Sequence, residues 1–248
     1  FVMETTNAKI KDMIYNAKDF IDNNIFKNSP EERIIVVDGI VGDTNSCEFL
    51  FLLKEANFNS MNRYHKSEIK DCEWNLAEMA TEEAIKYKGK KPGGWQEICY
   101  WIEAYRNPTA KFLDSRLCGG NLLGNALMNI KKIAGPSSSN PEVFERILCS
   151  DEYKKLICDE IAEINPNIVV CCGTYDWAKK LYSISSNDEV NLQCGYKYFK
   201  TTINDKMNYF LEYMHPSQRG AAKKYALHFA VAKEVFGELK EVIASSKR

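Results

Sequence analysis

The sequence predicts an α/β fold in which helices cover both faces of a parallel or mostly parallel sheet. Short, nearly continuous apolar runs at 47–57 and 167–173 are typical of strands that are buried on both faces. Segments with helical periodicity stand between such runs, so strands and helices alternate through most of the chain. Since no repeat, linker or compositional break is visible, we expect one domain over 1–248.

The elements of the first half follow from the spacing of apolar residues. Residues 8–24 place their apolar side chains on one face, which predicts an N-terminal helix. Residues 32–46 begin with a β-branched run and end in turn residues, which is typical of a short strand. Residues 67–88 and 95–106 again have helical spacing and predict two helices.

The second half continues the alternation. Its predicted elements are a strand and a Gly-, Pro- and Ser-rich loop at 125–141, a helix at 141–166 ending near Pro166, the strand at 167–173, a helix at 174–184, one or two strands at 196–215 with a turn near Asn204 and Asp205, and a long amphipathic helix from Ala221.

Charge and hydropathy exclude some classes of protein. The chain has 248 residues and a formal net charge of −1, so it has no global attraction to nucleic acid or to anionic membranes, and a polyanion partner needs a local basic patch. No apolar run approaches the roughly 20 residues of a membrane span. The N-terminal segment is polar and charged, without the features of a signal peptide. We therefore expect a cytoplasmic protein with no membrane partner.

The cysteines and histidines do not predict a metal centre. The chain has nine cysteines without a C-x-x-C pair, and only three histidines. Zinc and iron–sulfur sites usually show such a pair, so we expect neither a metal nor another cofactor. Scattered cysteines in a chain of this length are typical of reduced core thiols in a cytosolic protein.

Polar residues stand at the ends of four predicted strands. Strand by strand, these polar residues and their neighbours are Lys54, Glu55, Asn57 and Phe58; Asn129, Lys131 and Lys132; Gly173 and Thr174; and His215, Pro216, Ser217 and Arg219. Ligands of open α/β sheets bind beyond the carboxyl ends of the strands. If these strands are parallel neighbours, a carboxylate, an amide, a histidine and a hydroxyl converge on one edge of the sheet.

Each of these residues also has a purely structural interpretation. Glu55 can mark the exit of a buried strand to solvent, and Asn129 can be a hydrogen-bonded core residue. The His215–Ser217 segment can be a turn in which Ser217 caps the last helix. The conjunction of all of them in one chain favours a site.

Three of these segments together resemble the uracil-DNA glycosylase superfamily. "LLKEAN" resembles its first motif, "ALMNIKK" resembles the strand that carries its base-reading Asn, and "HPS" before a basic helix start resembles its C-terminal motif. "INPNIVVCCGT" matches its third strand. The resemblance covers roughly residues 34–236 and implies a three-layer α/β/α sandwich around a central, mostly parallel four-stranded sheet. The region around 59–120 is then a helical insertion.

The resemblance implies roles for individual residues. Glu55 matches the residue that positions water and faces the sugar cation, and Asn129 matches the Asn that binds the flipped base. His215 matches the His that donates to a base carbonyl, and Ser217 matches the phosphate-gripping Ser. Arg219 lies in the segment that matches the duplex-entering loop.

The neighbouring residues extend this expectation. Asn57 and Phe58 continue the first motif, and Phe58 or Tyr64 is close enough to Glu55 in sequence to supply an aromatic face for an extruded base. Lys131 and Lys223 belong to local basic groups that suit contacts with phosphate.

Some residues depart from the family pattern. Lys54 stands where many members have Gly, Asn57 where they have Pro, and Gln218 where several have Pro. The iron–sulfur cysteine pairs of some members are absent. These departures leave the identity of the base open.

The chemistry of the residue types agrees with this activity. Cleavage of an N-glycosidic bond builds positive charge on the sugar and negative charge on the leaving base. A carboxylate such as Glu55 suits the first and can orient water, and a donor such as His215 suits the second. The sequence therefore predicts a monofunctional, monomeric DNA glycosylase that acts on uracil or another modified base of single- or double-stranded DNA.

Three further interpretations stay open. The modified base can be a bulky pyrimidine of foreign DNA, which would make the protein a defence factor. The same fold can be a non-catalytic nucleic-acid-binding module, or a hydrolase of free nucleosides or nucleotides. Release of a free base from DNA distinguishes the glycosylase from the last two.

Overall fold

The computed structural model describes residues 5–21, 35–42, 44, 46–54, 73–93, 95–112, 117–133, 141–216 and 225–246. Its strands are β1 (Ile35–Val37), β2 (Gly39–Ile40), β3 (Phe49–Leu53), β4 (Glu73–Asn75), β5 (Ala126–Asn129), β6 (Ile168–Cys172), β7 (Val190–Asn191), β8 (Lys197–Ile203) and β9 (Lys206–Tyr213). Its α-helices are α1 (Thr6–Asn16), α2 (Lys18–Phe20), α4 (Leu76–Lys86), α5 (Gln96–Arg106), α6 (Pro141–Cys149), α7 (Asp151–Ile164), α8 (Tyr175–Leu181) and α9 (Tyr225–Ser245).

A mostly parallel sheet forms the centre of the molecule, as the sequence predicts. Within the described ranges it has seven strands in the order β2-β5-β3-β6-β9-β8-β7. The four inner strands β5, β3, β6 and β9 run parallel to one another, whereas β2, β8 and β7 pair in the antiparallel sense. The expectation of a four-stranded sheet is therefore wrong in number: three antiparallel strands extend the parallel core at its two edges.

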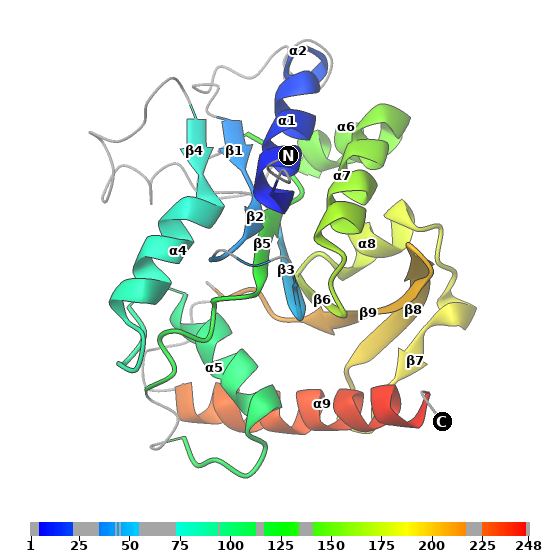
Figure 1. Cartoon of the computed structure of the whole chain (residues 1–248). Helices are drawn as coiled ribbons and strands as arrows, with labels where there is room; N and C mark the ends of the chain where they lie inside the picture. Colours follow the sequence, from blue (N-terminus) through cyan, green and yellow to red (C-terminus); the bar gives the residue numbers. More distant parts are fainter. Residues whose placement is uncertain are drawn as a thin grey trace.

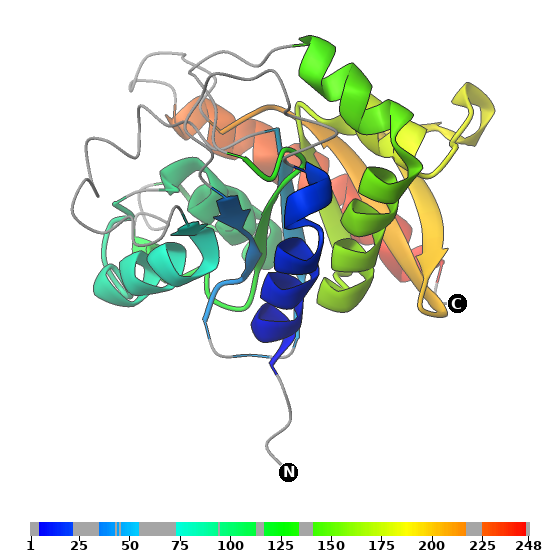
Figure 2. The same ribbon diagram turned by 90° about the horizontal axis from the view of Figure 1, so that it is seen from above.

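The core lies on both faces of this sheet because the inner strands carry apolar side chains on both faces. On β3, Phe49, Phe51 and Leu53 pack under α4, α5 and α9, while Leu50 and Leu52 pack under α1, α6, α7 and α8. Figure 1 shows these two groups of helices on opposite sides of the sheet, and Figure 2 shows α1 beside α7. All five residues of β3 are buried, which explains its continuous apolar sequence.

Two of the predicted helices are shorter than expected. The helix expected at 141–166 is divided into α6 and α7 at Ser150, whose side chain accepts a hydrogen bond from the Tyr153 main-chain nitrogen as an N-cap. The helix expected at 67–88 begins only at Leu76, since Glu73–Asn75 pair with β1 in a separate two-stranded sheet. Residues 67–72 lie outside the described residues.

One edge of the sheet is closed by a side chain. The amide of Asn7 on α1 donates from Nδ2 to the Ile40 carbonyl oxygen at 2.8 Å and accepts from the Ile40 nitrogen at 2.7 Å. Asn7 thus occupies the hydrogen-bonding groups of β2 that face away from β5. A Cβ at Gly39 would lie 2.4 Å from Asn7 Oδ1, so only glycine allows this approach.

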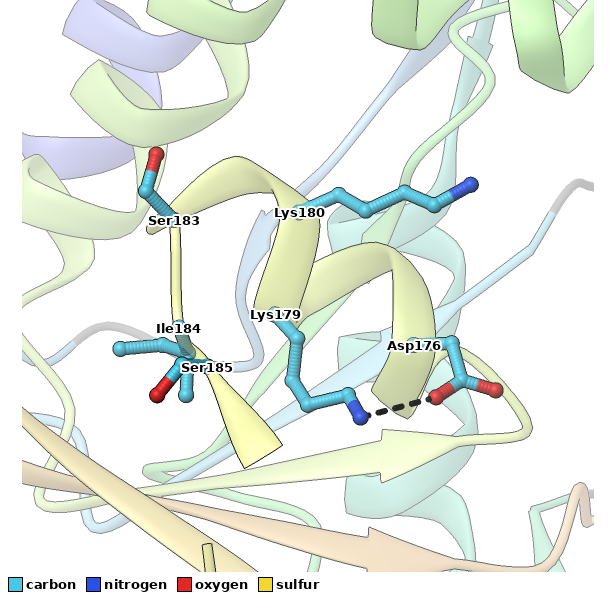
Figure 3. Close-up of a pocket in the computed structure, with 6 residues that line it drawn as sticks. All are labelled: Asp176, Lys179, Lys180, Ser183, Ile184 and Ser185. Atoms are coloured by element: carbon cyan, nitrogen blue, oxygen red, sulfur yellow. Dashed lines mark ion pairs between the residues drawn. The ribbon is translucent and has the colours of Figure 1, made fainter. Parts of the chain in front are cut away.

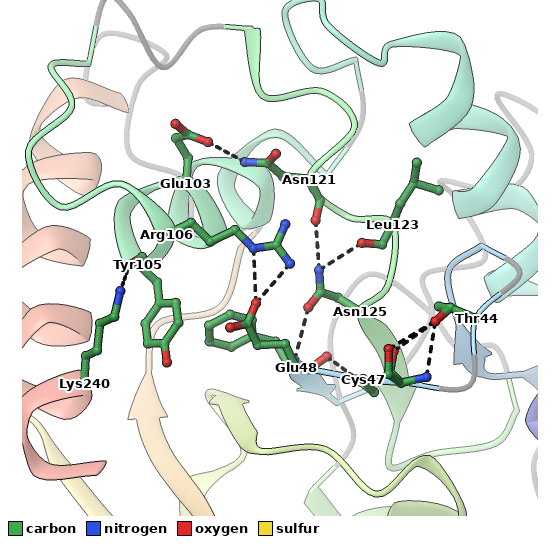
Figure 4. A network of polar contacts seen from close by, with 12 residues as sticks. Thr44, Cys47, Glu48, Glu103, Tyr105, Arg106, Asn121, Leu123, Asn125 and Lys240 are labelled. Carbon is green, nitrogen blue, oxygen red and sulfur yellow. Dashed lines mark hydrogen bonds and ion pairs between the residues drawn. The ribbon is translucent and has the colours of Figure 1, made fainter. Parts of the chain in front are cut away.

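A polar network ties together the amino ends of β3 and β5 (Figure 4). Asn125 Oδ1 accepts from the Phe49 nitrogen at 3.1 Å, and its Nδ2 donates to the Asn121 carbonyl at 2.8 Å. Arg106 donates to Glu48 Oε2 through Nε and Nη2 at 3.1 and 3.0 Å. These groups form hydrogen bonds with one another, so we assign a structural role to the amino ends of these strands.

Candidate functional site

Three residues meet at the carboxyl ends of the parallel strands, opposite the amino-end network of Asn125 and Glu48. Lys54 follows β3, Gly173 follows β6 and His215 lies two residues beyond β9. A Cβ built on Gly173 would lie 3.6 Å from Lys54 Cε and 3.9 Å from His215 Cβ. Gly173 has a φ of +67°, a conformation that favours glycine. Glycine is favoured at 173 by this backbone angle and not by lack of space, and the residue lies between a lysine and a histidine that follow two other strands.

Main-chain and side-chain hydrogen bonds fix the positions of these strand ends. The β3–β5 ladder continues past Leu53, since the Lys131 nitrogen donates to the Lys54 carbonyl at 2.9 Å. The Gly173 nitrogen donates to the Tyr213 carbonyl at 2.9 Å. Thr174 Oγ1 donates to the Leu52 carbonyl at 2.8 Å. The end of β3 is thus held between its two parallel neighbours.

The environment of His215 favours the neutral imidazole. His215 is half-buried, and burial lowers its pKa below the usual 6.5 because the charged ring loses hydration. The cation of Lys54 lowers the pKa of His215 further. A neutral imidazole at pH 7 presents one N–H donor and one acceptor, as a hydrogen bond to a leaving group requires.

Asn129, the last residue of β5, is brought to the same edge but is buried. It is 1% exposed, and it pairs in register with Leu53, the residue before Lys54. Its Nδ2 donates to Asp38 Oδ1 at 3.1 Å. Among the described residues its Oδ1 has no hydrogen-bond partner. The structure thus gives the amide nitrogen a role in the core and leaves the carbonyl oxygen open.

Asp38 belongs to a buried charge cluster that the sequence analysis missed. Lys132 Nζ lies 2.5 Å from Asp38 Oδ2 and 2.8 Å from Glu160 Oε2, and all three side chains are 0% exposed. Lys132 is therefore not part of a basic surface patch. One signal was available, because Asp38 interrupts an apolar run at 34–41; its partners lie too far away in sequence to be found from spacing.

The ionisation of this cluster follows from its burial. Burial raises the pKa of Asp38, and Lys132 opposes the rise. Burial raises the pKa of Glu160 to about 8, with repulsion from Asp38 adding to it. The pKa of Lys132 is raised: burial lowers it, but its two carboxylate partners outweigh that effect. At neutral pH these shifts favour a charged Lys132 and a protonated Glu160.

Lys131 is also placed away from bulk solvent. Its residue is 3% exposed, although the sequence suggested a contact with phosphate. That contact stays a prediction. The remaining site residues lie outside the described residues, and their roles also stay predictions: Glu55, Asn57, Phe58, Tyr64, Ser217, Arg219 and Lys223.

A surface hollow of about 660 Å³ lies at α8 and the turn after it (Figure 3). Asp176, Lys179, Lys180 and Ser185 line it. Its cations are already paired, Lys179 with Asp176 at 3.3 Å and Glu189 at 2.9 Å, and Lys180 with Glu145 at 3.5 Å. The hollow is shallow and charge-compensated, so we place the candidate site at the strand ends and not here.

Several other features bear on cofactors and surroundings. Within the described ranges, no cluster of three or more His, Cys, Asp or Glu side chains could hold a metal ion. No helix of the part of the chain that the structure describes is long and apolar enough to cross a membrane. The described cysteines are free thiols, and burial raises the pKa of Cys47 and of Cys99 to about 12. Such thiols are poor nucleophiles.

Fold and strand-end geometry define an α/β protein with a mostly parallel sheet and a polar carboxyl edge. Comparison with known proteins does not narrow this class. No model of a protein family matches the chain, and no curated protein shows detectable similarity to it.

Proposed function

We propose that this protein is a DNA glycosylase that hydrolyses the bond between a flipped base and its sugar. The observation that carries the proposal is the meeting of Lys54, Gly173 and His215 at the carboxyl edge. Asn129 ends the neighbouring strand at that edge. The residues that resemble the glycosylase motifs stand at the ends of β3, β5 and β9, with the glycine of the third-strand motif after β6.

The electrostatics of this edge suit a leaving base. Negative charge develops on the base as the glycosidic bond breaks. A neutral His215 can strengthen a hydrogen bond to a base carbonyl at that moment, and the Lys54 cation beside it attracts the same charge. Interactions of this kind lower the barrier without tightening the binding of the intact DNA. Glu55, which follows Lys54 directly, is proposed to act on water and on the sugar cation.

We extend the proposal to the type of fold, the mechanism and the target base. The fold would be of the uracil-DNA glycosylase type, extended by β2, β7 and β8. The enzyme would be monofunctional, because hydrolysis needs only water as the nucleophile. The target would be uracil or another modified base, and a bulky pyrimidine of foreign DNA would give a role in defence.

The test is mass analysis of bases released from duplex and single-stranded oligonucleotides that carry different modified bases. Wild-type protein should release at least one of them. His215→Ala should lower the single-turnover rate at saturating DNA by about 10²-fold, with little loss of affinity. His215→Gln, which keeps an N–H donor, is the matched control and should lose less.

The alternatives give different outcomes in the same assay. Salt-sensitive DNA binding with no released base would indicate a binding module. Turnover of a free nucleoside without DNA binding would indicate a nucleoside hydrolase. Equal rates for wild type and His215→Ala would contradict the role of the strand-end histidine.

A further inference from the structure

The carboxylate of Asp38 fixes one end of the Asn129 side chain. Asn129 Nδ2 donates to Asp38 Oδ1 at 3.1 Å, so the amide nitrogen of Asn129, and not its carbonyl oxygen, faces this carboxyl group. This hydrogen bond holds the amide of Asn129 against rotation about its last torsion.

Lys132 contacts the second oxygen of Asp38 and leaves Oδ1 to Asn129. Its Nζ contacts Asp38 Oδ2 at 2.5 Å and is itself held by Glu160 Oε2 at 2.8 Å, with all three side chains 0% exposed. A buried ion pair is costly to desolvate and is weak evidence for stability alone. The pair needs another explanation, and the fixed orientation of Asn129 provides one.

The other end of the Asn129 amide is left open. Its Oδ1 is buried and has no partner among the described residues. A buried acceptor without a donor costs roughly 1–3 kcal/mol, so a ligand that brings an N–H group to this atom recovers that free energy. Asn129 ends β5 beside the end of β3, at the edge where Lys54 and His215 meet.

We propose that Asp38 is a positioning residue that turns the Asn129 amide so that Oδ1 receives the flipped base, and that the site therefore selects bases with an N–H donor on the edge it reads. This inference rests on the proposed function. Uracil and its 5-substituted forms carry such a donor at N3, and cytosine carries one at its exocyclic amine. A pyrimidin-2-one base has neither.

The experiment compares three duplexes that differ only in one base: uracil, cytosine or pyrimidin-2-one. Single-turnover rates of base release are measured for wild type, Asp38→Asn and Glu163→Gln. Asp38→Asn is nearly isosteric but can present either end of an amide to Asn129, so the orientation is no longer fixed. Glu163→Gln is the matched control, because it neutralises a carboxylate of α7 that pairs with Lys9 and has no described contact with Asp38, Lys132 or Asn129.

For wild type, the release rate of the faster of the two donor-bearing bases should be well above that of pyrimidin-2-one. The ratio of these two rates is the quantity that we compare. Asp38→Asn should reduce that ratio of rates by roughly 10- to 100-fold, the effect of one mispaired buried polar group. Glu163→Gln should leave the ratio within about twofold of wild type, because it shares no partner with Asp38. Comparing ratios across variants removes the intrinsic difference between the leaving groups.

If Asp38→Asn does not fold, the double variant Asp38→Asn/Lys132→Met replaces the ion pair by neutral groups and tests the same ratio. An unchanged ratio in a folded variant would overturn the role of Asp38 while leaving the glycosylase intact. Wild-type protein that releases no base from any DNA would overturn the proposed function, and this inference with it.

Discussion

Glu160 is a carboxyl group that folding holds in its protonated form. Two carboxyl groups share the single cation of Lys132 in a site without solvent, and full ionisation would leave a net negative charge there. The proton resides on Glu160, whose pKa rises to about 8. Folded protein therefore binds a proton between pH 4.5 and 8 that unfolded protein releases.

This difference predicts a pH dependence of stability. The contribution of Glu160 is fully present below its unfolded pKa of 4.5 and is lost as the pH rises through about 8. The free energy of unfolding should fall between these values by up to about 1.4 kcal/mol per pH unit from this group. Urea denaturation at pH 5.5, 7 and 8 measures it. In Glu160→Gln the slope should be smaller; an identical slope would show that the group does not take up the proton.

The buried lysine shows what single residues cannot reveal in a sequence. Lys131 and Lys132 stand after an apolar strand and suggest a phosphate contact, yet neither is more than 3% exposed. The partners of Lys132 lie 94 and 28 residues away, at Asp38 and Glu160. No local pattern links such positions, because only the packing of β5 against α7 and the β1–β2 segment brings them together.

At the scale of elements, the β8–β9 hairpin has a turn whose residues carry unusual backbone angles. Asn204 and Asp205 have φ values of +49° and +60°. Two consecutive positive φ values are those of a type I′ turn, which matches the twist of the strands it joins. Asparagine adopts this conformation more readily than most residues, whereas glycine is favoured at the second position.

Asp205→Gly should therefore stabilise the protein, by about 1 kcal/mol or less, because glycine has no Cβ to strain at this φ. The control is Asp159→Gly, in the middle of α7, where glycine should destabilise by about 0.5 kcal/mol. Chemical denaturation of the two variants and wild type gives the comparison. Destabilisation by both substitutions would argue against the turn geometry.

The most accurate predictions concern elements whose pattern of apolar residues is typical of only one kind of secondary structure. The strand prediction at 47–57 is confirmed by β3 because apolar residues face two cores, and the helix prediction at 95–106 is confirmed by α5. The turn near Asn204 is confirmed as well. The elements β4 and β7 were not predicted, since they have three and two residues and no periodicity can be recognised over that length.

At the scale of the whole molecule, the near-zero net charge means that the DNA binding we propose would depend on a few cations. Overall attraction is weak at −1, so each phosphate contact should be visible in the salt dependence. Arg219→Ala should weaken duplex binding and reduce the salt slope by about one contact. Lys155→Ala, an exposed helix position paired with Asp159, is the control. An unchanged slope for Arg219→Ala would remove it from the DNA interface.

The candidate site was partly accessible from sequence. Alternation of strands and helices predicts that Lys54, Asn129, Gly173 and His215 lie at one edge, and the parallel order β5-β3-β6-β9 confirms that common edge. The direction of the Asn129 side chain was not accessible, because it depends on Asp38, which lies between β1 and β2 and far from Asn129 in sequence.

The two edges of the central sheet differ in what they offer to another chain. At β2 the outward hydrogen-bonding groups of Ile40 are taken by Asn7, so no foreign strand can be added there without displacing α1. At the other edge, β7 has two residues, both exposed. An edge this short gives little template for strand addition. β7 pairs only with Lys197 and Tyr198, so the outer side of 199–203 on β8 has no partner among the described strands. Aggregation by extension of the central sheet would therefore start on the β8 side and not at β2.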